Sequence, residues 1–253
     1  MNKPGCTARA APAIQVGCAG WSIPSQVSSL FSSGESHLER YARVYPCVEI
    51  NSSFYRPHHP KTYARWASSV PGTFRFSVKV PRTITHQLRL QQCKAPLLAF
   101  LGEVAALEDK LGCILLQLPP SLALEVDQAK SFFSLLRKYT PVPVACEPRH
   151  VSWFTPQGAD VLRKAGIACV RAHPSPIAGA QPLGDQAMFY IRLHGAPDVY
   201  YSAYDDAFIE AVASRIREAH EEGREVWCIF DNTARGAAVP NALTLMRKLG
   251  IML

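Results

Sequence analysis

The sequence predicts a single-domain α/β protein, a TIM-type (β/α)8 barrel with parallel strands. Short apolar runs recur eight times along the chain, and the segments between them carry apolar residues at helical spacing. Dividing the 253 residues by eight gives about 32 residues per unit, the size of one strand and one helix in a parallel repeat. Eight such units favour a closed barrel.

The predicted strands are short runs rich in Val, Ile and Leu. Such strands are typical of a parallel sheet that is covered on both faces. They comprise residues 14–20, 48–54, 74–80, 113–118, 142–147, 167–172, 188–194 and 226–231. The first run ends in Gly17-Cys18-Ala19-Gly20-Trp21 and lacks the full G-x-G-x-x-G pattern of dinucleotide-binding folds. We therefore prefer the barrel to an open doubly wound sheet, and the chain carries no nucleotide-cofactor motif of this kind.

The predicted helices lie between the strands. Ser36 precedes Glu39 by three residues, the spacing of a capped helix start. The apolar faces of this helix and of three later ones are Leu38, Tyr41, Ala42 and Tyr45; Leu97, Leu101, Val104 and Leu107; Val126, Ala129, Phe133 and Leu136; and Phe208, Ile209, Val212 and Ile216. Residues 174–186 are rich in Pro, Ala and Gly, which predicts a long loop. We expect residues 1–13 to form a flexible tail and residues 14–253 to form the barrel domain.

Composition is that of a globular protein. Hydrophobic residues make up 48% and charged residues 19% of the chain, and the mean hydropathy is -0.01, which excludes a chain that is disordered throughout. The sequence has no run of roughly 18 uncharged apolar residues and no apolar segment of a secretory signal at its start. These features predict a cytoplasmic protein with no membrane partner.

Charge and cysteine content narrow the classes of partner. The net charge of +7 favours anionic ligands, but the basic residues are scattered, so nucleic acid is the less favoured partner. The eight cysteines contain no C-x-x-C pair, which argues against a cysteine zinc site. Five of them fall in the predicted strands, where we expect reduced, buried thiols.

Polar residues within the predicted strands indicate where a site forms. Alternate residues of a barrel strand face the helices and are apolar, so charged residues should point to the interior or its mouth. This alternation directs inward Glu49, Asn51, Ser53, Lys79, Gln117, Glu147, Arg149, Arg171, His173, Tyr190, Arg192 and His194, with Asp231 and Asn232 closing the last strand. These residues lie late in their strands, at the end where barrels build active sites.

Two interpretations of this cluster are open. The charges could cancel as structural ion pairs that fill the barrel, Glu49 with Lys79 and Glu147 with Arg149 or Arg192. Buried ion pairs are weak stabilisers, however, and the cluster contains more charged groups than such filling requires. A ligand site is the preferred hypothesis, and its arginines suit a carboxylate or phosphate, which a guanidinium binds with two parallel hydrogen bonds.

Several motifs along the chain resemble those of one family. They are Gly17-x-Ala19-Gly20-Trp21-Ser22, the run from Val48 to Arg56, Phe76-x-Val78-Lys79-Val80-Pro81-Arg82 with Ile84-Thr85-His86, Gln117-Leu118-Pro119-Pro120, Glu147-x-Arg149-His150-x-Ser152-Trp153, Arg192-Leu193-His194-Gly195 and Phe230-Asp231-Asn232-Thr233. From about residue 14 to 249 the chain resembles the YecE-like family, domain of unknown function seventy-two. The resemblance implies a TIM-type barrel and no established reaction.

The leading functional hypothesis is an enzyme or binder that acts on a small anionic ligand at the carboxyl-terminal mouth by general acid–base chemistry. The candidate catalytic residues are Glu49, Lys79, His86, Glu147 and His194. Glu49 or Glu147 would act as the base, Lys79 as an electrostatic clamp, and a histidine would transfer the second proton. The candidate ligand-binding residues are Trp21, Asn51, Tyr55, Gln117, Arg149, Arg192, Asp231 and Asn232.

Three alternatives remain from the sequence. Glu49 and Glu147 could be the carboxylate pair of a glycosidase, with Trp21 or Trp153 as a sugar platform. A metal-dependent phosphoester hydrolase could draw its ligands from His86, His150, His194, Glu49, Glu147 and Asp231. No local metal motif is present, so a divalent metal is not predicted. The third alternative is a non-catalytic module associated with nucleic acid.

Overall fold

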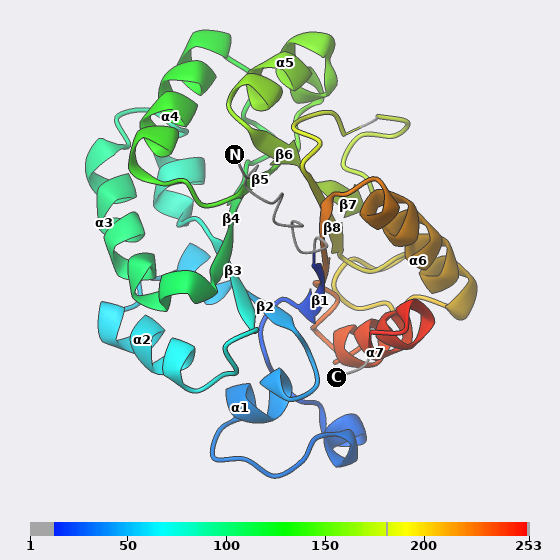
Figure 1. The fold of residues 1–253 in the computed structure, drawn as a ribbon. Helices are drawn as coiled ribbons and strands as arrows, with labels where there is room; N and C mark the ends of the chain where they lie inside the picture. Colours follow the sequence, from blue (N-terminus) through cyan, green and yellow to red (C-terminus); the bar gives the residue numbers. More distant parts are fainter. Residues whose placement is uncertain (1–12, 181, 252–253) are drawn as a thin grey trace, which may run out of the picture.

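Nine strands form two parallel sheets in the computed structural model, which describes residues 13–180 and 182–251 (Figure 1). The strands are β1 (Ile14–Cys18), β2 (Cys47–Ile50), β3 (Arg75–Lys79), β4 (Leu111–Gln117), β5 (Val144–Glu147), β6 (Ile167–Cys169), β7 (Arg171–His173), β8 (Met188–Leu193) and β9 (Glu225–Phe230). One sheet has the order β1-β9-β8-β7 and the other has the order β2-β3-β4-β5-β6. The predicted α/β class with parallel strands is confirmed.

The strand ladder differs from the expected closed barrel at two places. The sixth predicted run is divided at Val170 into β6 and β7, which belong to different sheets, and the Val170 N–H donates to the Cys146 carbonyl at 2.8 Å. Between β1 and β2 the pairing is a single bridge from Ala19 to Glu49, beside a 2.9 Å bond from the Gly20 N–H to the Glu49 carbonyl. Over the described residues the structure therefore has two open sheets and not one continuous barrel.

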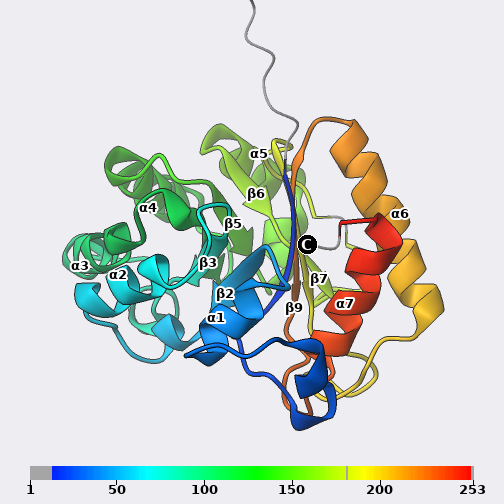
Figure 2. The same ribbon diagram turned by 60° about the horizontal axis from the view of Figure 1, so that its bottom comes forward.

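In the described part of the chain, seven α-helices lie on the outside of the strands (Figures 1 and 2). They are α1 (His37–Ala42), α2 (Pro60–Ser68), α3 (Lys94–Val104), α4 (Val126–Tyr139), α5 (Pro156–Lys164), α6 (Asp206–Glu221) and α7 (Ala238–Leu249). The predicted cap of α1 is present, because Ser36 Oγ accepts from the Glu39 N–H at 3.2 Å while the Glu39 carboxylate accepts from the Ser36 N–H. The second predicted apolar face is shorter than expected, since α3 ends at Val104 and a 3-10 segment carries Leu107.

Apolar side chains pack in two layers. The outer layer fills the space between strands and helices, and the inner layer lies between the two sheets, where Leu115, Tyr190 and Trp227 are fully buried. The cysteines from Cys18 to Cys228 are free and buried, as predicted, while Cys6 and nearly all of the predicted tail lie outside the described residues. Polar side chains take the place of this inner apolar layer at the carboxyl ends of the strands.

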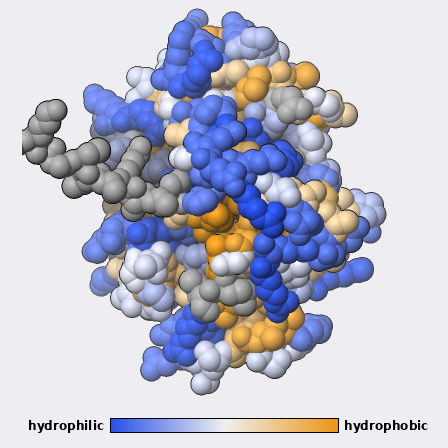
Figure 3. Space-filling model, turned by 45° about the vertical axis from the view of Figure 1, so that its right-hand side comes forward, coloured by the Kyte–Doolittle hydropathy of each residue, from blue (hydrophilic) through white to orange (hydrophobic). Residues whose placement is uncertain are grey.

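The outer surface is mainly hydrophilic on the face that carries α6 and α7. Figure 3 shows this cover interrupted by hydrophobic patches along the middle of the face. In residues 13–180 and 182–251, no helix has both the length and the apolar character that crossing a membrane requires.

Candidate functional site

A cluster of buried charged residues lies at the carboxyl ends of the strands. Glu49 comes from β2, Glu147 from β5 and Arg192 from β8, while His194 and Asp231 follow β8 and β9. All five are at most 5% exposed. The cluster therefore draws its members from both sheets, as the alternation of strand residues predicted.

Arg192 is the centre of this cluster. Its guanidinium donates to both carboxylate oxygens of Glu49, at 3.0 Å from Nε and 2.7 Å from Nη2. Nη1 donates to Glu147 Oε2 at 2.6 Å, and Nη2 also donates to Asp231 Oδ2 at 2.9 Å. The Tyr190 hydroxyl adds a bond to Glu49 Oε2 at 3.1 Å. Arg192 thus joins three carboxylates, and its fully buried guanidinium is not open to an external anion.

His194 is held by two of the same carboxylates. Its Nδ1 lies 3.0 Å from Asp231 Oδ2 and its Nε2 lies 3.3 Å from Glu147 Oε1. Burial lowers the pKa of His194, but the bonds to Asp231 and Glu147 outweigh burial and raise it above the ordinary value. Because both ring nitrogens face carboxylate oxygens, the geometry favours the imidazolium, in which both nitrogens donate.

Two carboxylates of the cluster, Glu147 and Asp231, are held in their charged form. Burial raises the pKa of Glu147, but Arg192, His194 and Arg149 together hold it well below its usual range. Asp231 behaves in the same way, since Arg192 and His194 outweigh the effect of burial and lower its pKa. Glu147 and Asp231 are therefore suited to hold Arg192 and His194 in place and to stabilise their positive charges. They are poorly suited to act as general bases.

Arg149 connects the cluster to solvent. Its side chain is 23% exposed, and its Nε and Nη2 donate to Glu147 Oε1 at 3.1 and 2.8 Å. A cavity of about 220 Å³ opens here, and its lining includes the polar side chains of Arg149, Glu147 and His194 together with Pro174 and Val199. The cavity places an accessible guanidinium next to a buried imidazole.

Lys79 lies near this ion-pair network but is not one of its members. Its amino group sits 4.2 Å from the centre of the Phe54 ring, and among the described residues it forms no salt bridge. Burial and the charge of Arg192 lower the pKa of Lys79 to about 8, although the nearby carboxylates oppose this shift. The predicted ion pair between Lys79 and Glu49 is wrong, because Arg192 binds both carboxylate oxygens of Glu49.

His86 follows β3 in a π-helical turn, Thr83–Gln87. Its Nδ1 lies 2.8 Å from Thr85 Oγ1, and its ring contacts Phe54 edge to face at 5.0 Å between centroids. Burial, followed by the charges of Lys79, Arg82 and Arg149, lowers the pKa of His86. A neutral imidazole therefore stands among several cations. Phe54 was not among the predicted site residues, yet it contacts three of them, Lys79, His86 and Tyr55. Its place in the motif that begins at Val48 was the available signal.

Comparison with known proteins decides the family. Residues 15–252 match the family described as protein of unknown function DUF72. The chain belongs to the DUF72 family. UPF0759 protein YunF of Bacillus subtilis (strain 168) is 23% identical over 273 residues, covering 94% of this chain and 95% of YunF. UPF0759 protein YecE of Escherichia coli (strain K12) is 37% identical over 106 residues, 42% of this chain and 38% of YecE.

Solved structures show the same fold. A DUF72 family protein of Thermotoga maritima MSB8 gives a TM-score of 0.79 at 23% identity, over 94% of this chain and 99% of that one. A DUF72 family protein of Enterococcus faecalis V583 gives a TM-score of 0.78 at 24% identity, over 94% and 96% of the two chains. The family match over residues 15–252 confirms the resemblance of the sequence motifs. The solved structures add a shared fold and carry no reaction with them.

Other predicted ligand residues of this DUF72 protein lie around the cluster. Asn51 follows β2, and its buried Oδ1 has no hydrogen-bond partner among the described residues. Gln117 ends β4, is 8% exposed and pairs in register with Glu147. Asn232 is fully buried and donates to the Ser202 carbonyl, which ties a loop together. Asn51 and Gln117 are thus near the site, whereas the amide nitrogen of Asn232 is used by the fold.

The two predicted aromatic ligand residues lie in different settings. Trp21 packs edge to face on Trp66, with 5.0 Å between ring centroids. Tyr55 is 67% exposed and contacts Phe54. Trp153, the other tryptophan considered as a sugar platform, is buried and donates to the Leu122 carbonyl, so it presents no face to a ligand.

The predicted alternation is wrong for the sixth strand of this DUF72 protein. Arg171 and His173 were expected inside, but Ala168 and Val170 belong to the inner layer and Arg171 lies over the Phe189 ring at 4.4 Å. The interior takes the small residues of this strand. Arg171 therefore lies on the outer face, where its guanidinium covers the ring of Phe189.

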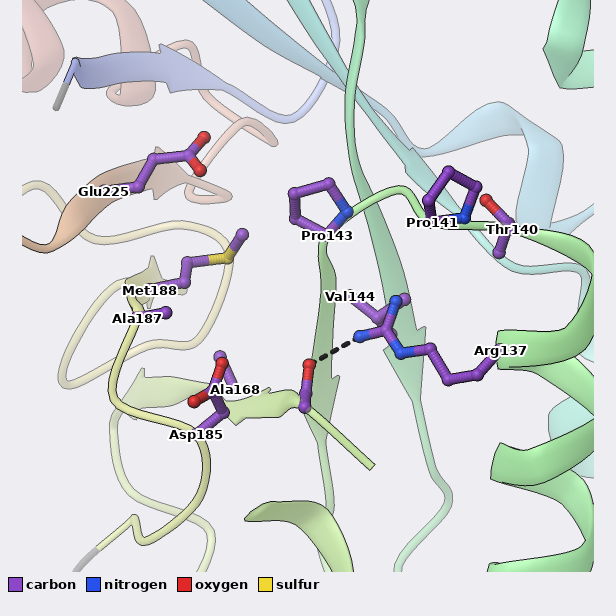
Figure 4. Close-up of a pocket in the computed structure, with 11 residues that line it drawn as sticks. Arg137, Thr140, Pro141, Pro143, Val144, Ala168, Asp185, Ala187, Met188 and Glu225 are labelled. Carbon is purple, nitrogen blue, oxygen red and sulfur yellow. Dashed lines mark hydrogen bonds between the residues drawn. The ribbon is translucent and has the colours of Figure 1, made fainter. Parts of the chain in front are cut away.

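A second cavity of about 380 Å³ lies at the opposite, amino ends of the strands (Figure 4). Arg137 lines it but donates to the carbonyls of Ala165, Val142 and Gly166 at 2.8, 2.7 and 2.5 Å. Its charged group is therefore committed to the backbone. Among residues 13–180 and 182–251, no group of three or more His, Cys, Asp or Glu is arranged to hold a metal ion.

Proposed function

We propose that this DUF72 protein binds a small anion bearing a phosphate or carboxylate group and acts on it by general acid–base chemistry. One observation carries the proposal. The cavity of about 220 Å³ has the partly exposed Arg149 on its wall next to His194, whose surroundings favour the imidazolium. An anion that enters would meet a guanidinium able to form two hydrogen bonds and a group able to give up a proton.

The same proposal treats the two sheets as halves of one interrupted (β/α)8 barrel. The Ala19 to Glu49 bridge and the Val170 to Cys146 bond lie at the two junctions between the sheets. Strands that run parallel around a common axis bring their carboxyl ends to one mouth, and barrel enzymes place their sites there. Glu49, Glu147 and Arg192 would then belong to a single mouth.

Each residue has a role in this scheme. Arg149 binds the anion, and Lys79 adds attraction because no carboxylate pairs with it among the described residues. His194 is the general acid through Nε2, whose contact with Glu147 is the longer one at 3.3 Å, while Asp231 holds the ring through Nδ1 at 3.0 Å. His86 is a candidate base, since its lowered pKa leaves it neutral. Arg192 acts as a positioning residue for the carboxylates and not as an anion binder.

The geometry does not favour the glycosidase alternative. A retaining or inverting glycosidase needs two carboxyl groups that flank the scissile bond and reach the sugar. Glu49 and Glu147 are both buried and both bind Arg192. Their oxygens are engaged within the protein.

A thermal-shift screen with Arg149→Ala tests the proposal. The panel contains phosphorylated sugars, nucleotides and organic acids, and a ligand at 100 times its Kd adds about 2.7 kcal/mol of stability. We expect an anion that stabilises the parent protein and has little effect on Arg149→Ala. The control is Arg163→Ala, which removes an exposed guanidinium that pairs with Asp160 on α5 and should leave the shift intact. Equal shifts in all three proteins would contradict the proposal.

A further inference from the structure

A cavity of about 270 Å³ lies outside the proposed active site, against the outer faces of β7 and β8 and beneath α6. Figure 1 shows these three elements side by side. Arg171 from β7 and Arg215 from α6 both line the cavity, and Ile191, Leu193 and Phe208 provide apolar surface. The cavity therefore combines two guanidinium groups with an apolar wall.

Neither of the two arginines is part of an ion pair among the described residues. Arg171 is only partly exposed, and its guanidinium carbon lies 4.4 Å from the centre of the Phe189 ring. In the described part of the chain neither Arg171 nor Arg215 forms a salt bridge or a side-chain hydrogen bond. Burial and the charges of Arg215 and Arg224 lower the pKa of Arg171. A partly desolvated positive charge with no partner is costly to the fold, so a ligand anion would lower its energy.

We propose that this cavity is a second anion site, which binds a phosphate or carboxylate group attached to a small apolar body. Two guanidinium groups from different elements can hold the oxygens of one such group with parallel, charge-assisted hydrogen bonds. The apolar part of the ligand would lie against Phe208 and Leu193. Burial of this apolar part supplies the remaining affinity.

The second site is separate from the central one but shares a wall with it. Ala172 and Ser175 line both cavities. Behind that wall, the His194 N–H donates to the His173 carbonyl at 2.8 Å, which ties β7 to the strand end that carries the general acid. Arg149 lines the central cavity but not the second one, so replacing Arg149 should not affect binding at the second site.

Isothermal titration calorimetry with phenyl phosphate tests this site. Arg171→Leu keeps an apolar contact with Phe189, and Arg215→Leu changes an exposed helix position, so the second variant remains informative if the first does not fold. The control is Arg217→Leu on the same helix, because Arg217 already pairs with Glu210. Inorganic phosphate and benzoate are titrated in parallel to separate the contributions of the anionic group and the ring.

We expect Arg215→Leu and a folded Arg171→Leu each to weaken phenyl phosphate binding by about tenfold or more, the loss that follows from removing one charge-assisted contact. Binding should persist in Arg149→Ala and in Arg217→Leu. If benzoate but not phenyl phosphate shows this dependence on Arg215 and Arg171, the result would support the site and assign it to carboxylates. The proposal is overturned if neither ring-bearing anion binds the parent protein, if Arg215→Leu binds as the parent does, or if Arg149→Ala abolishes binding.

Discussion

Arg192→Met is expected to lower the free energy of unfolding by about 3–5 kcal/mol, because it removes the partner of three buried carboxylates. Glu49 is fully buried and Glu147 is 1% exposed, so water cannot replace the lost hydrogen bonds. Methionine fills a similar length of the interior, and the loss therefore measures the uncompensated charge more than a cavity. Urea unfolding at neutral pH gives the value, and the melting temperature should fall by about 10 °C.

Two further variants sharpen this test. Arg217→Met removes an exposed ion pair with Glu210 and should cost less than about 1 kcal/mol. Adding Glu49→Gln to Arg192→Met should recover part of the loss, since one of the unpaired charges is then removed. A loss in Arg192→Met no greater than that in Arg217→Met would show that the cluster does not depend on this arginine.

Stability is expected to fall steeply as the pH drops below about 4, the ordinary range of carboxyl groups. Glu147 and Asp231 have lowered pKa values, so their contribution is present above the unfolded-state values and is lost as the pH falls through the folded values. His194 has a raised pKa, and its contribution is lost as the pH rises through that value. Lys79 acts in the opposite sense, because its unfavourable charge disappears as the pH rises above about 8. Glu147, Asp231 and His194 therefore contribute together at weakly acidic to neutral pH, and the loss of the Lys79 charge adds stability above about pH 8.

Urea unfolding between pH 3 and 9 measures this profile. Glu147→Gln should reduce the slope of the acid limb by up to one proton, or about 1.4 kcal/mol per pH unit. Asp160→Asn is the matched control, since the Asp160 carboxylate is partly exposed on α5 and binds Lys164 at the surface. An acid limb of the same slope in Glu147→Gln and the parent protein would contradict the assignment of acid sensitivity to the cluster.

Much of the fold could be predicted because the strands are buried on both faces and read as apolar runs. The alternation rule placed Glu49, Lys79 and Arg192 correctly, since their neighbours Val48, Val78 and Ile191 pack against helices. The break at Val170 could not be predicted, because it depends on how two sheets meet. The rule that a charged strand residue points inward failed there, since Arg171 has a stem long enough to lie on the outer surface.

The residues of the site could be predicted better than their hydrogen-bond and ion-pair partners. The sequence placed Arg149 and Arg192 together as anion binders, and nothing in it distinguished their burial. The structure separates them, because Arg192 is enclosed by three carboxylates while Arg149 reaches a cavity. Hydrogen-bond partners depend on distances across two sheets, which local periodicity does not encode.

The titration of His194 tests the central claim most directly. Imidazole nitrogen NMR, with the His194 signal assigned by its loss in His194→Gln, gives the pKa with and without the anion found in the thermal-shift screen. We predict a pKa above the ordinary value of about 6.5 in the free protein and a further increase with bound anion, because nearby negative charge stabilises the imidazolium. A pKa at or below the ordinary value that the anion leaves unchanged would contradict both the charge state of His194 and its place beside the ligand.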